Sequence, residues 1–447
     1  MRTIEQHAQA LSTGATTSRA LVEECLARIA DPRSEGARAF VKVHADAARA
    51  MADAMDTLRR AGRAPTRYAG IPVSLKDLVD IAGEPTPAGS RALADAAPAR
   101  ENAPVVQRML AAGFVPVGRT NMTEFAFSGL GINPHYGTPL SPWDRVAARI
   151  PGGSSSGTAV SVSDRMAVAG LGTDTGGSCR IPAAFCGIVG YKPTARRVPI
   201  QGVLPLAPSL DSVGPLAPSV GCCAIVDAVI AGEPPATPTP VALDGLRLAV
   251  VENMVLDGMD AVVSQVFDAT LATLSRAGAR VQHIRIAEFD EVPTLNARGG
   301  FAAAEAYAWH RRLLVEKGAL YDPRIRIRIE RGGPMTATDY LDLLAARRRL
   351  IAGLDTRTRE IDALVMPTVP IVPPRITELD DDRDYNRLNL HILRNTALAN
   401  FFDRCAISLP CQKPGDAPVG LMLVGETMGD ARLFAIAAAV EAALSGQ

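Results

Sequence analysis

Hydrophobic residues in the first sixty positions recur at the three- and four-residue spacing of amphipathic helices. Thr17 and Ser18 can cap a helix that runs through residues 21–30, whose apolar side chains share one face. A second amphipathic stretch, rich in alanine, covers residues 46–60. We therefore expect the chain to begin with a helical segment, residues 1–62.

After this segment, short apolar runs alternate with longer amphipathic ones. Residues 71–75 form a run that ends at Lys76, and a helical pattern over 103–112 precedes a second run at 114–118. Further strands are predicted near 246–250, 280, 362–367, 406–410 and 419–424. Further helices are predicted over 261–276, within 302–361, over 388–401 and over 430–444. This alternation is typical of a layered α/β fold.

Composition narrows the class of protein. The chain has 447 residues, of which 47% are hydrophobic, too many for a mainly disordered protein. Its 47 basic and 47 acidic residues cancel, so it lacks the basic excess that nucleic-acid binding requires. No uncharged apolar run reaches the ~18 residues that span a bilayer, and the N-terminus lacks the apolar core of a signal peptide. We expect a cytoplasmic protein with no nucleic-acid or membrane partner.

The seven cysteines match no zinc-binding spacing, and their number is odd. The chain is also far larger than the small domains that depend on disulfides. We therefore expect reduced thiols and no metal site.

Two glycine- and serine-rich segments, residues 152–157 and 172–178, carry the clearest candidate chemistry. Successive glycines let backbone N–H groups converge on one point, which makes a site for an anion. In Gly176-Gly177-Ser178 a hydroxyl follows such glycines, so the N–H groups of residues 175–178 could hold the negative charge that develops on a substrate oxygen. A serine hydroxyl is a weak nucleophile and needs a base.

The residues alone leave the identity of this base open. None of the six histidines lies in a motif with an acidic partner. The match of residues 153–157 to G-x-S-x-G, centred on Ser155, lacks the strand that should precede it. Lys76 could lose its charge through burial and then accept a proton. Alternatively, Lys76 emerges at the strand end and pairs with Asp77 or Asp80.

The chain closely resembles the amidase signature family in several motifs. These motifs are Gly70-Ile-Pro-Val-Ser-Leu-Lys-Asp77, Arg119-Thr-Asn-Met-Thr-Glu-Phe-Ala126, Gly152-Gly-Ser-Ser-Ser-Gly157, Gly172-Thr-Asp-Thr-Gly-Gly-Ser178 and Gly190-Tyr-Lys-Pro-Thr194. The resemblance spans nearly the whole chain and is densest from 68 to 218. It implies one compact α/β domain over residues 1–447, with a large mixed central sheet covered by helices on both faces. After the helical residues 1–62 come a signature core, 63–220, and a more divergent substrate-side half, 240–447.

The resemblance also implies a catalytic triad. Lys76 matches the family's lysine, and Ser178 matches the serine that becomes acylated. Ser154 matches the serine that bridges them, after a cis peptide bond with Gly153. Neutral Lys76 would take a proton from Ser154, which would take one from Ser178, and no cofactor would be needed.

Other residues of these motifs receive supporting roles from the same resemblance. The N–H groups of Thr175, Gly176 and Gly177 would face the oxyanion, and Met122 and Ser128 match positions near the substrate.

Several residues outside the triad have structural interpretations. Asp174 and Arg180 flank the nucleophile, and we expect them to hold its loop as an ion pair. Whether Asn395, Asn400 and Asp403 border the substrate stays open. Seven arginines predict solvated helix faces: Arg324, Arg326, Arg328, Arg331, Arg347, Arg348 and Arg349.

We expect an amidohydrolase that cleaves a small-molecule carboxylic amide through an acyl-enzyme on Ser178 and releases ammonia or an amine. One alternative is the glutaminase (A) subunit of a tRNA-dependent amidotransferase, which shares the triad but differs from this chain over residues 390–404. A second is a noncatalytic phosphate-binding protein, although the chain lacks G-x-x-x-x-G-K-[ST]. A homodimer is compatible with the resemblance, and the sequence does not identify the amide.

Overall fold

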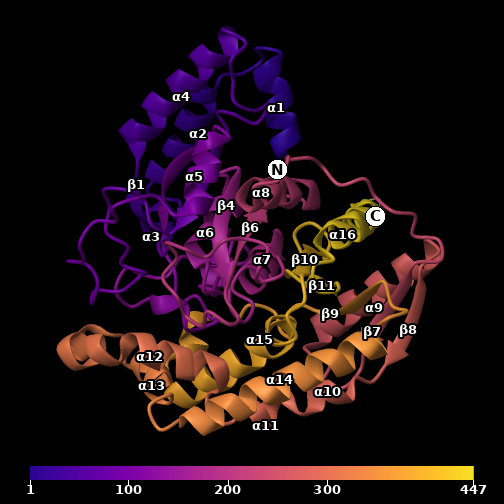
Figure 1. Cartoon of the computed structure of the whole chain (residues 1–447). Helices are drawn as coiled ribbons and strands as arrows, with labels where there is room; N and C mark the ends of the chain where they lie inside the picture. The colour runs from indigo at the N-terminus through magenta and orange to yellow at the C-terminus, as the bar shows by residue number, and fades with distance from the viewer. Residues whose placement is uncertain (446–447) are drawn as a thin grey trace.

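The short apolar runs of the sequence pair into one large sheet at the centre of the molecule (Figure 1). The structure is a computed structural model and describes residues 1–445. In these residues the strands are β1 (Phe40–Val43), β2 (Pro72–Lys76), β3 (Val115–Thr120), β4 (Ala169–Asp174), β5 (Val189–Lys192), β6 (Ser212–Ala217), β7 (Arg247–Val251), β8 (Arg280–Ile284), β9 (Ala363–Pro367), β10 (Ala406–Pro410) and β11 (Gly420–Val424).

Within the described residues the sheet has eleven strands in the order β1-β3-β2-β4-β6-β5-β10-β11-β9-β7-β8. Strand β2 is parallel to β3 and β4, and β7 is parallel to β8 and β9. The other neighbouring strands run antiparallel. The predicted mixed sheet is therefore confirmed.

Helices lie between and beyond the strands. They are α1 (Ile4–Ser12), α2 (Ser18–Ala30), α3 (Gly36–Ala39), α4 (Ala45–Arg60), α5 (Pro104–Ala111), α6 (Ser156–Ser163), α7 (Arg180–Cys186), α8 (Val220–Ala231), α9 (Ala261–Arg276), α10 (Ala287–Asp290), α11 (Val292–Asn296), α12 (Gly300–Lys317), α13 (Pro323–Glu330), α14 (Ala337–Arg357), α15 (Asp382–Phe401) and α16 (Asp430–Ser445). Short 3₁₀ turns are η1 (Glu124–Ala126), η2 (Arg145–Ala147), η3 (Gly318–Leu320) and η4 (Ile376–Leu379).

Both faces of the sheet are covered, because successive side chains of a strand point to opposite faces and both sets are apolar. In β7, Leu248 and Val250 pack into one core cluster, whereas Ala249 and Val251 pack into another. Helices α1, α5, α8, α9 and α16 cover the first face. The second is covered by α2, α4 and α6 at one end of the sheet and by α10, α12, α14 and α15 at the other (Figure 1). The chain forms a single compact domain.

Two expectations about the elements need correction. Residues 40–43, inside the segment predicted to be helical, form β1, which pairs with β3. A strand of four residues is too short to stand out against the helical periodicity on either side. Helix α15 begins at Asp382, earlier than the predicted residue 388, because Asp381 accepts hydrogen bonds from two N–H groups of its first turn. The division into 1–62, 63–220 and 240–447 stays a prediction.

Candidate active site

Lys76 occupies the last position of β2, where parallel strands β3 and β4 flank it on both sides. Its side chain is fully buried, and Nζ donates to Ser154 Oγ and to Thr173 Oγ1, both at 2.8 Å. The alternative pairing with a nearby aspartate is wrong. Asp77 instead accepts from Arg119 at 2.7 Å, and Asp80 accepts from a threonine hydroxyl.

Burial lowers the pKa of Lys76 to about 7, because a charged ammonium loses its water inside the protein. The nearby groups Cys179, Asp174 and Asp211 oppose this change, but their effect is smaller. Near neutral pH a large fraction of Lys76 is therefore the uncharged amine, which can accept a proton.

Ser154 follows a cis peptide bond with Gly153. The backbone on both sides of this bond is held: Gly153 N–H donates to Gly129 O at 2.8 Å, and Ser154 O accepts from Thr123 N–H at 3.1 Å. The cis bond predicted from the resemblance is thus present, and the Ser154 hydroxyl lies within hydrogen-bonding distance of Lys76.

Ser155 immediately precedes α6, and its Oγ lies 3.4 Å from Thr173 O. Among residues 1–445 no histidine bonds to this hydroxyl, so the G-x-S-x-G match gives no Ser-His arrangement at Ser155. Its N–H donates to Ser178 O at 3.4 Å, which brings the backbones of the two serine-rich segments together.

Ser178 lies in the loop between β4 and α7 and is only 4% exposed. Within the described part of the chain its hydroxyl makes no hydrogen bond, so it stays available to a substrate. Of the three residues predicted to form a triad, Lys76 and Ser154 share a direct side-chain contact, and Ser178 joins them through the backbone of Ser155.

Asp174 holds the backbone on both sides of Ser178. Its Oδ1 accepts from Gly177 N–H at 2.8 Å, and its Oδ2 accepts from Cys179 N–H at 3.1 Å. The N–H of Gly177 is therefore directed to a carboxylate rather than to a substrate. Between residues 1 and 445, the N–H groups of Thr175, Gly176 and Ser178 have no such acceptor.

The predicted ion pair between Asp174 and Arg180 is confirmed. Arg180 donates through Nη2 and Nε at 2.8 and 3.0 Å, and both side chains are fully buried. Burial alone would raise the pKa of Asp174, but the charge and hydrogen bonds of Arg180, together with Lys192 and Asn400, outweigh burial and lower that pKa to about 2. Asn400 completes the group, since it accepts from Arg180 at 2.7 Å and donates to Asp174 at 3.0 Å.

The other residues left open by the sequence have separate surroundings. Met122 is buried in an apolar cluster, and Ser128 Oγ donates to Asn389 Oδ1 at 2.8 Å. Asn395 donates to two backbone carbonyls, and Asp403 pairs with an arginine.

The prediction of solvated arginines is wrong at two positions. The Nε atom of Arg328 is closed off from solvent and has no partner among the described residues, while Nη1 donates to Phe127 O at 3.3 Å. Arg347 donates to the carbonyls of Phe401, Asn400 and Ser209 at 2.7, 3.1 and 3.0 Å. The arginine-rich pattern of the helices hides these contacts, because their partners are 53 to 201 residues away in sequence.

Sequence reasoning missed three residues near the site. Thr173 binds Lys76, Asp211 accepts from the Thr175 hydroxyl at 2.5 Å, and Asn389 holds Ser128. Thr173 lies inside a quoted motif, next to Asp174, and could have been singled out there. Asp211 and Asn389 carry no local signal.

A family model described as Amidase matches residues 20–434. The chain belongs to the amidase family. It is 36% identical to 2-amino-5-chloromuconic acid deaminase of Comamonas testosteroni, over 99% of this chain and 96% of that protein. It is 37% identical to the A subunit of glutamyl-tRNA(Gln) amidotransferase from Anaeromyxobacter dehalogenans, over 96% of this chain and 93% of that one. A crystal structure of an amidase matches with a TM-score of 0.89 and 31% identity, over 99% of both chains.

This amidase is a hydrolase of the carbon–nitrogen bond in small-molecule amides. Between residues 1 and 445, no helix is long and apolar enough to cross a membrane.

Proposed function

We propose that this amidase works through an acyl-enzyme on Ser178, with Lys76 as the base and Ser154 as the relay between them. The observation that carries the proposal is the hydrogen bond between the buried Lys76 amine and the Ser154 hydroxyl. Thr173 supports it, because a neutral amine that donates to Thr173 can turn its lone pair toward Ser154.

In the proposed reaction the Ser178 oxygen forms a bond to the amide carbon as its proton passes to Ser154 and the Ser154 proton passes to Lys76. When the carbon–nitrogen bond breaks, Ser154 protonates the departing ammonia or amine and recovers its own proton from Lys76. Water then attacks the ester carbon, and its proton passes to Ser154 as the Ser154 proton passes to Lys76. When the ester bond breaks, Ser178 recovers a proton along the same path.

The negative oxygen formed in each step needs donors. The free N–H groups of Thr175, Gly176 and Ser178 support an oxyanion site at the loop. Gly177, also expected there, acts indirectly in our proposal, because its N–H anchors the loop to Asp174.

Three serine variants and one lysine variant test this mechanism. Ser178→Ala, Ser154→Ala and Lys76→Ala should each lower kcat by about 10²–10⁴-fold, as expected for a nucleophile, relay or base. Mass spectrometry with a slow substrate should detect an acyl adduct on wild type and none on Ser178→Ala. Ser156→Ala is the matched control, because the Ser156 hydroxyl is buried and has no partner within the described residues. Full activity of Lys76→Ala would exclude the lysine as base.

We further propose that the substrate carries a carboxylate, which Arg328 binds. The unused Nε of Arg328 supports this, since a charged donor atom closed off from solvent normally meets an anion, while Nη2 donates to Asn386 Oδ1 at 3.0 Å. Arg328 contacts Phe127, and Gly129, two residues later, supports the peptide bond before Ser154. The Comamonas relative is named for an acid, 2-amino-5-chloromuconic acid.

The substrate class is tested with a pair of amides of similar size, succinamic acid and butyramide. Arg328→Gln should raise KM for succinamic acid about 10–100-fold, which corresponds to the loss of one hydrogen bond to a charged group. The KM for butyramide should stay unchanged. Arg326→Gln is the control, because Arg326 pairs with Glu330 on the exposed side of the same helix. Equal losses with both amides would contradict carboxylate recognition.

The similarity to amidotransferase A subunits keeps a second function under consideration. The purified chain alone should hydrolyse amides at full rate if it is an independent amidase. An activity that appears only with glutamine, charged tRNA and copurified partner subunits would favour the glutaminase function.

A reducing cytoplasm and a homodimer are also part of the proposal. All seven cysteines are unpaired, and six of them are buried, which supports a compartment where thiols stay reduced. Fractionation of the native cells tests the cytoplasmic location. Sedimentation equilibrium of the pure protein tests the homodimer.

A further inference from the structure

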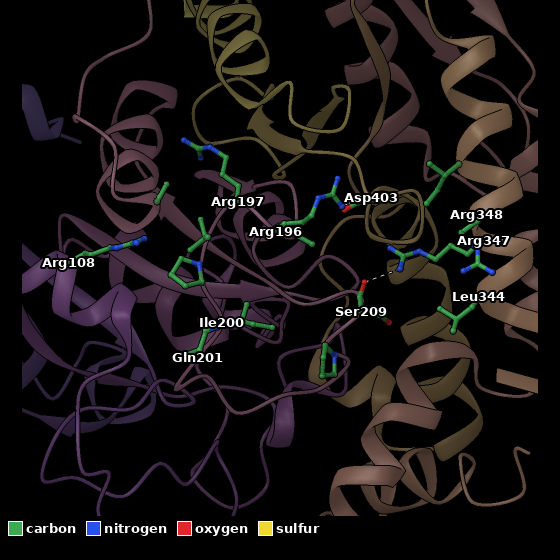
Figure 2. Close-up of a pocket in the computed structure, with 16 residues that line it drawn as sticks. Arg108, Arg196, Arg197, Ile200, Gln201, Ser209, Leu344, Arg347, Arg348 and Asp403 are labelled. Atoms are coloured by element: carbon green, nitrogen blue, oxygen red, sulfur yellow. Dashed lines mark hydrogen bonds and ion pairs between the residues drawn. The ribbon is translucent and has the colours of Figure 1, made fainter. Parts of the chain in front are cut away.

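A cavity of about 600 Å³ lies outside the candidate active site. It is bounded by residues 195–201, by residues 208–209 and by α14 (Figure 2). None of Lys76, Ser154 and Ser178 lines it. Its volume falls in the range of small-molecule sites, ~300–1,000 Å³.

Arginines dominate the wall of this cavity. Five of them line it, Arg108, Arg196, Arg197, Arg347 and Arg348, against a single lining carboxylate, Asp403. Asp403 is already paired with Arg196. Arg197 is neutralised from outside the cavity by two other acids.

The remaining three guanidinium groups have no carboxylate partner among residues 1–445. Arg108 donates only to Ile230 O, at 2.6 Å, and Arg347 donates only to backbone carbonyls. Arg348 makes no hydrogen bond or ion pair at all in this part of the chain. Burial lowers the pKa of Arg347, which shows that its charge is held at a cost in free energy. The cavity therefore has an excess of positive charge.

We propose that this cavity binds a small organic anion with two or more carboxylates. Figure 2 shows Arg108 on one side of the cavity and Arg347 and Arg348 on the other, so three guanidinium groups without a carboxylate partner among the described residues are available to more than one carboxylate. Apolar lining residues, such as Ile200 and Leu344, favour a carbon frame over inorganic phosphate.

Arg348 provides the cleanest variant, because it is exposed and its replacement breaks no side-chain hydrogen bond or ion pair among the described residues. The neighbouring Arg349 pairs with Glu291 and does not line the cavity, so Arg349→Gln is the matched control. Arg348→Lys, which keeps the charge, should bind better than Arg348→Gln.

The experiment is isothermal titration calorimetry of the full chain with citrate at constant ionic strength. Citrate should bind one site per chain, and Arg348→Gln should weaken it about tenfold, whereas Arg349→Gln should not. Ser178→Ala and Arg328→Gln should leave citrate binding unchanged, which separates this site from the proposed substrate site.

Two results would overturn the proposal. One is citrate binding that is equal in Arg348→Gln and wild type, or absent in wild type. The other is binding that is lost in Arg328→Gln, because citrate would then occupy the active site. Inorganic phosphate that binds as tightly as citrate would show that the carbon frame contributes nothing and would also contradict it.

Discussion

The charge state of Lys76 sets a pH dependence that can be measured directly. The lysine must be neutral to accept a proton, so kcat/KM should increase with pH and level off above the pKa of Lys76, which burial lowers to about 7. Below that pH the rate should fall about tenfold per unit, since the neutral fraction falls by that factor. An exposed lysine would instead give a rate that keeps rising past pH 10.

The magnitude follows from the burial of the side chain. A change of pKa from 10.5 to about 7 corresponds to about 5 kcal/mol of preference for the neutral amine. At pH 7 this raises the neutral fraction from about one in three thousand to about one half. Burial therefore increases the concentration of active base about a thousandfold.

The assay is initial-rate ammonia release from a neutral amide between pH 5.5 and 9, at several temperatures. Asp174 cannot produce this transition, because its pKa is about 2, and the pKa of Cys179 is raised far above the range. Burial also raises the pKa of Asp211. Measurements at several temperatures distinguish titration of Asp211 from titration of Lys76, because the pKa of an amine falls steeply on warming and that of a carboxyl barely changes. A flat profile, or a transition independent of temperature, would refute the reasoning.

Three further predictions concern the loop and its support. Asp174→Asn leaves the buried Arg180 charge uncompensated and should lower the free energy of unfolding in urea by about 3–5 kcal/mol. Gly177→Ala should abolish activity, because Gly177 has φ +133° and a Cβ there meets a threonine hydroxyl. Gly62→Ala, at φ +67° with open space around the added Cβ, should stay active and controls for a glycine replacement at positive φ that meets no neighbour. Ser128→Ala should cost about 1–3 kcal/mol in the same unfolding assay, since Asn389 and Tyr385 lose their shared partner.

Local patterns predicted much of the fold. Apolar runs of five or six residues gave β2, β7, β9, β10 and β11, since strands buried on both faces read as continuous hydrophobic segments. Strand β1 was missed, because its four residues are defined only by pairing with β3, some eighty positions later. Strands β5 and β6, in the glycine- and proline-rich region before residue 218, also received no prediction.

The sequence by itself determined which chemical groups the candidate site contains, because the glycine and serine spacing and the resemblance it supports point to Lys76, Ser154 and Ser178. Only the tertiary structure decided what those groups can do. Lys76 has a low pKa because β3 and β4 bury it, a fact that no local pattern contains. Likewise, the use of the Gly177 N–H by Asp174 and the enclosure of the Arg328 Nε atom depend on contacts made when the chain folds. Desolvation and hydrogen-bond geometry are properties of the packed chain. Asn400 and Asp174, for example, are 226 positions apart in sequence and form their hydrogen bond only when the chain folds.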